Sequence, residues 1–378
     1  MMSERAFPVG HRLDTLRSDL RAASLEALVV THLPNLRYLT GFSGTAGLTL
    51  ITARRCLLVI DFRYETAART LLADFPNGLI EIRLVERTYD ETLVDVLLES
   101  AAGQVGIEAS SMTVGRFNRL TEALAKLERD RPTNSTILVP TERIVERRRA
   151  VKDPVEIQIL REAARRLSQV ARDLPALIRE GRTELEIAAD IDAAIRKAGF
   201  ERPAFETIVA AGENGAKPHA RPGNRQLRGG DWVVLDFGGI YDGYCVDLTR
   251  TLPVGAVGSD MSRVATAVRE AHDAAIASVR PGARPSEIDA AARQVLANHG
   301  LAEAFGHGTG HGLGLEVHED PRISKLPAAL PDEPVVPGMV FTIEPGAYIA
   351  GLGGVRIEDD VLVEEHGCEV LTDVPIGF

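Results

Sequence analysis

A glycine at every second position from Gly306 to Gly314 limits what the stretch FGHGTGHGLGLEVHE, residues 305–319, can form. Each glycine in a helix or strand costs about 0.5–1 kcal/mol relative to alanine, so five of them argue against a helix here. His307 and His311 are four residues apart, but without a helix this spacing does not indicate the histidine pair of a zinc protease. We expect an extended segment instead.

Alternate residues of an extended segment share a face, so His307 and His311 are expected to point the same way. The glycines leave the other face open to close packing of a neighbouring backbone. His318 has the opposite parity and needs a bend or bulge to join the other two. A single histidine is usually a surface or core residue, so the meaning of all three depends on what folds around them.

A first pair of carboxylates lies in DWVVLDFGGIYDGYCVDLTRT, residues 231–251. Asp236 directly follows an apolar strand, and Asp247 comes eleven positions later. If Asp242 and Gly243 form the turn of a hairpin, a pairing in which residue numbers sum to 483 sets Asp236 opposite Asp247. Like charges placed so closely repel unless a cation lies between them. Two solvated aspartates at strand ends are the alternative.

A second pair repeats this arrangement in MVFTIEPGAYIAGLGGVRIEDDVLV, residues 339–363. Glu344 and Glu358 flank a glycine-rich turn centred near Gly351, and their numbers sum to 702. Buried carboxylates normally pair, take up a proton or bind metal. Four of them would be neutralised by two divalent cations, an arrangement used for metal-assisted hydrolysis. Oxygen ligands with one imidazole suit Mn²⁺ or a similar hard ion better than a thiolate site would.

The order of predicted elements divides the chain in two. Helical and β-rich runs alternate up to a charged, proline-containing connection near residue 150, which predicts an α/β domain. A long helix is expected to begin after Asp153 as N-cap, to run over 156–179 and to break at Pro175. Helices over 184–198, 259–279 and 286–299 follow, the last with Ser286 as N-cap and Gly300 as its stop. Strands dominate from residue 339, which predicts an α+β domain.

Composition excludes several classes of function. A net charge of −11 over 378 residues argues against a nucleic-acid partner, because phosphate binding requires clustered Lys and Arg. No apolar run of 18 residues and no secretory leader are found, so we expect neither membrane insertion nor export, and we place the chain in the cytoplasm. Three cysteines far apart in sequence do not indicate a disulfide framework or a CxxC site.

Several motifs together resemble the M24, or pita-bread, metallopeptidases, and within them the aminopeptidase P and prolidase branch. The C-terminal resemblance rests on AKPHARPGN, LDFGG, CVDLTRT, GTGHGLGLEVHE, TIEPG and RIEDD. In the N-terminal part, NLRYLTGFSGTAG and VIDFRY resemble the creatinase-like domain of short bacterial Xaa-Pro aminopeptidases. The resemblance implies a creatinase-like α/β domain over 1–140 and a pita-bread α+β catalytic domain over 141–378.

The resemblance also implies the site residues. Five metal ligands are expected, namely Asp236, Asp247, His311, Glu344 and Glu358. Proton transfer and substrate contacts are expected of His219, His307, His318 and Glu344. A supporting role toward the substrate is expected of Arg356, and weaker assignments to the proline pocket and to a neighbouring subunit's site fall on Phe205 and Arg63.

The implied activity is Xaa-Pro aminopeptidase, in which a water activated at a dinuclear centre attacks the bond before proline in the second position. The cofactor would be two divalent ions, most simply Mn²⁺, with Co²⁺ or Zn²⁺ as alternatives, and relatives with this architecture are commonly homodimers. Three alternatives stay open: an Xaa-Pro dipeptidase (prolidase), a non-catalytic binding module, and a metal-free creatinase. The intact set of five ligands argues against the last two.

Overall fold

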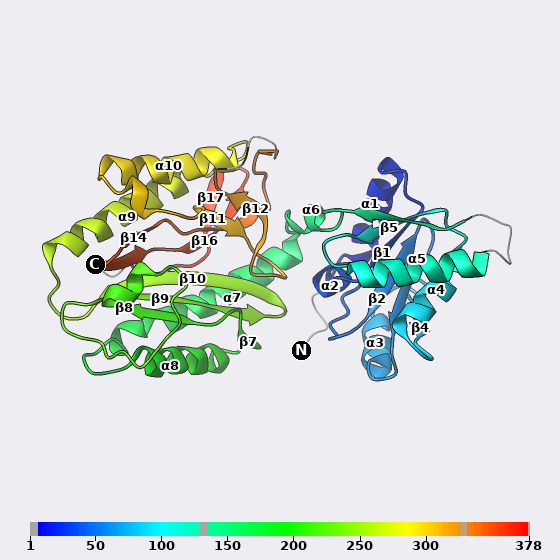
Figure 1. Cartoon of the computed structure of the whole chain (residues 1–378), viewed down its shortest axis with the longest axis horizontal. Coiled ribbons are helices and arrows are strands. Elements are labelled where there is room, and N and C mark those ends of the chain that lie inside the picture. Colours follow the sequence, from blue (N-terminus) through cyan, green and yellow to red (C-terminus); the bar gives the residue numbers. More distant parts are fainter. Residues whose placement is uncertain (1–6, 129–134, 326, 328–330, 377–378) are drawn as a thin grey trace. The chain divides into compact units, whose positions relative to one another are not determined.

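The computed structural model describes residues 7–128, 135–325, 327 and 331–376 and divides the chain after Arg149 (Figure 1). The two compact units are Met1–Arg149 and Ala150–Phe378. All three cysteines, Cys56, Cys245 and Cys368, are free. Within the described residues, no helix combines the length and apolar character needed to cross a bilayer.

The first unit alternates strands and helices, which confirms the predicted α/β class. Its sheet has the order β4-β3-β2-β1-β5-β6, in which β2 runs antiparallel to β1 and β3 while the other pairs are parallel. Two short helices, α2 and α3, were not predicted. The elements are α1 (Val9–Ala22), β1 (Ala27–Val30), α2 (Leu33–Thr40), β2 (Leu48–Thr52), β3 (Cys56–Ile60), α3 (Glu65–Leu72), β4 (Glu81–Leu84), α4 (Tyr89–Ser100), β5 (Gln104–Glu108), α5 (Val114–Glu128), β6 (Ile137–Thr141) and α6 (Glu146–Arg149).

The second unit begins with helices and ends with strands, as predicted for an α+β domain. Its helical elements are α7 (Pro154–Arg172), η1 (Leu174–Ala176), α8 (Glu184–Lys197), η2 (Gly212–Ala216), α9 (Ser259–Ser278), α10 (Pro285–Asn298) and η3 (Ala302–Ala304). Its strands are β7 (Arg202–Pro203), β8 (Ile208–Ala211), β9 (Trp232–Tyr241), β10 (Tyr244–Pro253), β11 (Gly310–Gly312), β12 (Glu319–Ile323), β13 (Val340–Ile343), β14 (Gly346–Ile349), β15 (Gly353–Arg356), β16 (Asp359–Glu364) and β17 (Gly367–Val370).

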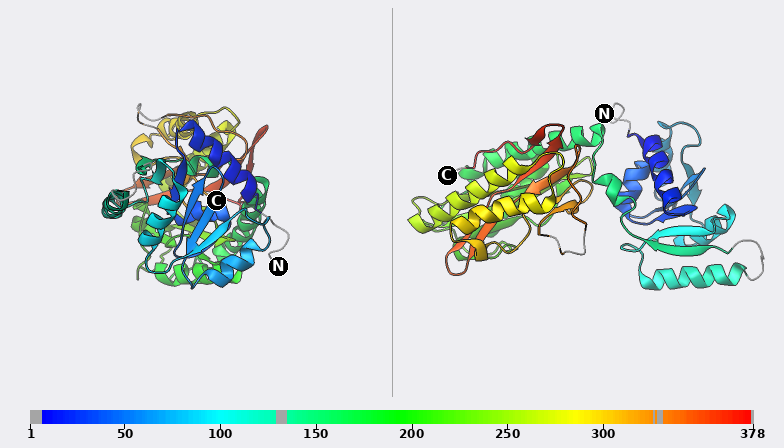
Figure 2. Two further views of the ribbon diagram at one scale, coloured as in Figure 1. Left: turned by 90° about the vertical axis from the view of Figure 1, so that its right-hand side faces the viewer. Right: turned by 90° about the horizontal axis from the view of Figure 1, so that it is seen from above.

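Helices cover two sides of the strands in this unit. The long hairpin β9–β10 pairs with β7 and β8 and packs against α7, while β12-β11-β13-β16-β17 forms a second sheet. Figure 2 shows α9 and α10 side by side, and their alanine- and valine-rich faces share a buried cluster with β13, β15 and β16. A bridge between Thr249 and Glu358 joins β10 to the segment that precedes β16. The two sheets therefore meet at the residues that carry the predicted ligands.

Helix ends confirm one predicted cap and correct two details. Asp153 caps α7 through the backbone N–H groups of Val155 and Glu156. That helix ends at Arg172, earlier than predicted, and only the short η1 follows around Pro175. Ser286 is not the N-cap of α10, because the helix already begins at Pro285, a residue whose fixed φ suits the first turn.

Candidate metal centre

The β9–β10 hairpin places two aspartates on one face, but not in the predicted register. Tyr241 pairs with Tyr244, so paired numbers sum to 485 rather than 483, and Asp236 lies opposite Thr249. The cause is a two-residue turn in which both Asp242 (φ 47°) and Gly243 (φ 72°) are left-handed, as a type I′ turn requires. Asp236 and Asp247 are therefore diagonal neighbours on the same face.

The register predicted for the glutamates is confirmed. The ladder β13–β16 pairs Ile343 with Asp359, and the ladder β14–β15 pairs Gly346 with Arg356, so paired numbers sum to 702 in both. Glu344 and Glu358 lie between these two ladders, one on each strand. Because both residues lie in the gap between the two ladders, we expect their side chains to approach the same point from two neighbouring segments of the chain.

The glycines of β11 allow the close backbone approach that their spacing predicted. A Cβ on Gly310 would lie 1.8 Å from the carbonyl oxygen of Thr342, and a Cβ on Gly312 would lie 2.1 Å from that of Asp320. The β11–β12 ladder also shifts its register between His311 and Gly312. This irregularity allows the rings of His311 and His318 to lie 4.3 Å apart despite their opposite parity.

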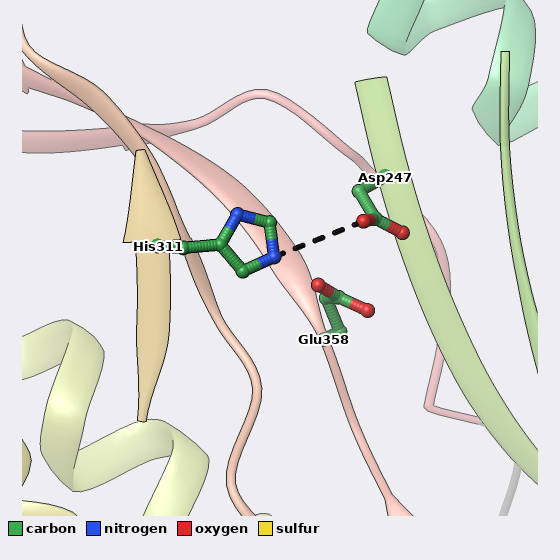
Figure 3. Close-up of side chains that lie close together, drawn as sticks. All are labelled: Asp247, His311 and Glu358. Carbon is green, nitrogen blue, oxygen red and sulfur yellow. Dashed lines mark ion pairs between the residues drawn. The ribbon is translucent and has the colours of Figure 1, made fainter. Parts of the chain in front are cut away.

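Three of the five predicted ligands converge directly. Single donor atoms of Asp247, His311 and Glu358 all lie within 4.8 Å of one another, and Figure 3 shows the three side chains directed toward a common point. Glu344 is next to them, with Oε1 3.7 Å from His311 Nε2. The fifth, Asp236, is held by Arg356, whose Nη2 lies 2.5 Å from Asp236 Oδ2. That these five residues are ligands stays a prediction.

The tautomer of His311 suits a ligand. Its Nδ1 lies 3.1 Å from the carbonyl oxygen of Gly312, which only accepts hydrogen bonds, so the proton belongs on Nδ1. Its Nε2 then presents a lone pair toward Asp247 and Glu344. Burial lowers the pKa of His311 to about 4, so the imidazole is neutral near pH 7.

The charge of Arg356 only partly offsets the burial of the carboxylates. Burial, followed by repulsion from neighbouring carboxylates, raises the pKa of Asp247 and of Glu358 well above the usual range. Burial also raises the pKa of Glu344 to about 8. The buried Oδ1 atoms of Asp236 and Asp247 accept no hydrogen bond from any residue that the structure describes. A divalent cation would supply both the missing charge and the missing partner, so the donor set fits a metal.

A chain of hydrogen bonds leads from Asp236 to His307 through a residue that the sequence analysis missed. Arg356 donates to Asp236 and, through Nη1 at 2.7 Å, to the hydroxyl of Tyr348. Tyr348 in turn donates to Nε2 of His307 at 2.8 Å, since Nδ1 of that histidine faces the carbonyl oxygen of Gly308. Burial lowers the pKa of His307 to about 4, which keeps this acceptor neutral. The sequence did offer one signal for Tyr348. Its number has the same parity as that of Glu344, so the two side chains are expected on the same face of the hairpin.

Two further contacts position the carboxylates themselves. Thr249 Oγ1 donates to Glu358 Oε2 at 2.6 Å, and the backbone N–H of Asp247 donates to Asp360 Oδ2 at 3.1 Å. Each contact ties β10 to the segment of Glu358 and β16. Thr249 and Asp360 were not singled out from the sequence, because the contacts join segments more than one hundred residues apart.

The remaining predicted residues lie around this centre or outside its unit. Burial is the main cause that lowers the pKa values of His307 and His318, and a smaller contribution from His219 to both indicates that the three histidines are near one another. Phe205 packs beside Gly238, where an added Cβ would lie 2.7 Å from its ring. Arg63 belongs to the first unit, where it pairs with Asp61 at 2.8 Å.

Comparisons with known proteins cover nearly the whole chain. The family model described as metallopeptidase family M24 matches residues 158–365, and that of the creatinase/prolidase N-terminal domain matches residues 12–151. An Xaa-Pro dipeptidase of Pyrococcus horikoshii is 34% identical over 354 residues, 92% of this chain and 93% of that protein. The solved structure of an Xaa-Pro dipeptidase from Bacillus anthracis matches with a TM-score of 0.89 at 33% identity, covering 97% of this chain and 98% of that one. An X-Pro aminopeptidase from Thermotoga maritima matches with a TM-score of 0.82 at 32% identity, covering 95% and 99%.

Proposed function

Because this chain belongs to metallopeptidase family M24, a family of metal-dependent peptidases, we propose that it hydrolyses the bond between an N-terminal residue and a proline in the second position. The observation that carries the proposal is the convergence of Asp247, His311 and Glu358 beside Glu344. These four donors are buried or half-buried, and the charge of the nearby Arg356 only partly offsets the effect of burial on Glu344 and Glu358, so the group suits metal-assisted hydrolysis better than a structural ion pair.

We assign the metal to five side chains and expect two divalent ions, most simply Mn²⁺. The ligands are Asp236, Asp247, His311, Glu344 and Glu358. A set of oxygen donors with one imidazole favours a hard ion over an ion that prefers thiolate ligands. Bound cations would acidify a water molecule and polarise the scissile carbonyl.

The surrounding residues supply proton transfer and orientation. We assign Glu344 the role of accepting a proton from the attacking water, which is supported by its 18% exposed side chain and its position beside His311. His318 and His219 are both exposed, and we assign them hydrogen bonds to the substrate backbone and to the oxyanion that develops during attack. His307 accepts a hydrogen bond from Tyr348, and we assign it to the same group of proton-handling residues. We also assign Phe205, which packs beside Gly238, to the pocket for the proline.

Whether the chain prefers longer peptides or dipeptides depends on how it binds a free carboxylate. Two of the three similar proteins described above are named Xaa-Pro dipeptidases, so the comparisons do not favour the aminopeptidase expected from the sequence. Arg322 supports the dipeptidase. It is exposed and lies opposite His311 in the β11–β12 ladder, and its charge helps to lower the pKa of His318 after the larger effect of burial. A guanidinium there suits the carboxylate of an Xaa-Pro dipeptide.

The deciding experiment compares an Xaa-Pro dipeptide with an Xaa-Pro-Xaa tripeptide on protein loaded with Mn²⁺, with an EDTA-treated control. Cleavage lost with EDTA supports the proposal, and the preferred substrate identifies the specificity. Arg322→Ala should raise KM for the dipeptide by about tenfold more than for the tripeptide, whereas Arg322→Lys should recover part of the loss. No cleavage of either substrate by metal-loaded protein would reject the proposed function.

Two variants test the ligands. Asp247→Ala and His311→Ala should each lower bound metal and abolish most turnover, and undiminished turnover in metal-repleted protein would reject the assignment. We also propose a homodimer in which Arg63 of one copy approaches the site of the other. Light scattering measures whether the protein is a dimer in solution. Arg63→Ala should change KM only in a dimeric protein.

A further inference from the structure

A buried carboxylate outside the metal centre holds the segment that carries His219. Glu184, the first residue of α8, is 0% exposed. Its Oε1 accepts from the backbone N–H of Ala211 at 2.8 Å, and its Oε2 accepts from that of Gly223 at 3.1 Å. The side-chain amide of Asn214 donates to both oxygens, at 3.0 and 3.2 Å. All of these donors belong to residues 211–223.

These bonds secure both ends of that segment to one helix. Ala211 closes β8, and Gly223 ends the loop that follows η2. Backbone bonds add to the anchor, because Leu185 donates to the carbonyl of Gly223 and Glu184 to that of Arg225. The segment is thereby closed on α8 as a loop with fixed ends, and His219 lies near its middle with an exposed side chain.

The segment also packs on β15 and on Arg356. A Cβ on Gly354 of β15 would lie 2.0 Å from the carbonyl oxygen of Gly215, so η2 touches β15 backbone to backbone. The carbonyl of Pro218 accepts from Nη1 of Arg356 at 3.4 Å. The residue before His219 is therefore in contact with the arginine that holds Asp236.

We propose that Glu184 is a positioning residue for substrate binding, acting through His219 and not through the metal. The inference rests on the proposed function. A fully buried carboxylate is costly unless its oxygens are fully hydrogen-bonded, and here four hydrogen bonds from three nitrogen atoms meet that need only when the segment is in place. The carboxylate thus stabilises one position of the loop, and a displacement of about 1 Å in a substrate-contacting group can cost on the order of 100-fold in rate.

The test compares Glu184→Gln with Glu186→Gln, a matched change on the same helix. Glu186 is exposed, and its side chain accepts from the backbone N–H of Thr183 in the capping box of α8, so its variant reports the loss of helix capping. Glu184→Gln replaces one acceptor oxygen by a donor that faces N–H groups. We expect kcat/KM on the Xaa-Pro substrate to fall on the order of 10- to 100-fold for Glu184→Gln and less than twofold for Glu186→Gln, with bound metal unchanged in both.

A double variant shows whether the effect passes through His219. In a His219→Ala background, Glu184→Gln should change kcat/KM by no more than about twofold, because the group that it positions is gone. A loss of the same size in both backgrounds would overturn the proposal. So would a loss of bound metal in Glu184→Gln, or unchanged kinetics in a folded variant. Asn214→Ala should reproduce part of the effect and serves if Glu184→Gln does not fold.

Hydrogen exchange tests the anchor without any substrate. In metal-free Glu184→Gln, amides over 211–223 should exchange faster than in the wild type, while those of β9 and β10 stay unchanged. Unchanged exchange over 211–223 would also overturn the proposal. If the wild type cleaves no Xaa-Pro substrate, the proposed function fails, and this measurement still decides whether Glu184 holds the loop.

Discussion

Removal of divalent cations should make the stability of the second unit fall as pH rises from about 4.5 to about 8. Burial raises the pKa of Glu344 from 4.5 to about 8 in the metal-free folded protein, whereas an unfolded chain releases that proton near 4.5. Between these values the folded state binds more protons than the unfolded state, so the free energy of unfolding decreases with pH. The stabilisation is complete below pH 4.5 and is lost once pH passes about 8.

The size of this effect follows from the two pKa values. They differ by about 3.5, and at about 1.4 kcal/mol per unit this corresponds to roughly 5 kcal/mol. For a unit of this size, one kcal/mol changes Tm by about 2–4 °C, so Tm should differ by roughly 10–20 °C. Asp247 and Glu358 change in the same direction, because burial raises their pKa values too.

Thermal unfolding in EDTA measures the effect, with Glu344→Gln as the control that keeps the shape of the side chain and removes its titration. The variant should match the wild type near pH 5 and exceed its Tm near pH 8. Mn²⁺ added near pH 8 should restore the wild type, since a ligand that binds only the folded state stabilises it. The reasoning is refuted if the two metal-free proteins show the same dependence on pH.

Three smaller changes test the packing around the site. Gly310→Ala should destabilise the protein by about 3 kcal/mol or more in chemical denaturation. In the control Gly306→Ala, the added Cβ meets no described residue within 4 Å, so stability should change by less than about 0.5 kcal/mol. Similar losses in the two variants would contradict the close backbone approach at Gly310. Thr249→Val removes the hydrogen bond to Glu358 and should weaken metal binding by about 10- to 100-fold in a chelator competition, with unchanged affinity arguing against this contact. Asp153→Ala should cost about 1 kcal/mol through loss of the α7 cap without changing metal content, and a measurable loss of metal would show that the helix start does more than cap.

The local parts of the site were predictable because short-range rules govern them. The register of Glu344 and Glu358 follows from a glycine-rich turn that both flanking ladders share, and it was predicted correctly. The register of Asp236 and Asp247 was predicted wrongly by two, because the placement of the turn residues, not the spacing of the acids, decides the pairing. A hairpin signal therefore predicts which residues share a face more securely than which residues are opposite.

The sequence alone was sufficient for the two fold classes and the close packing at Gly310, since periodicity and glycine sterics act on neighbouring residues. The set of residues to consider at the centre came from the resemblance to a known family. The sequence did not indicate the roles of Tyr348 or Glu184. Their partners, His307 and the segment around Asn214, lie about 30 to 40 positions away, and no local pattern marks a hydrogen bond over that separation. Only tertiary structure decides which donors meet a buried oxygen, because desolvation makes the contact depend on everything packed around it.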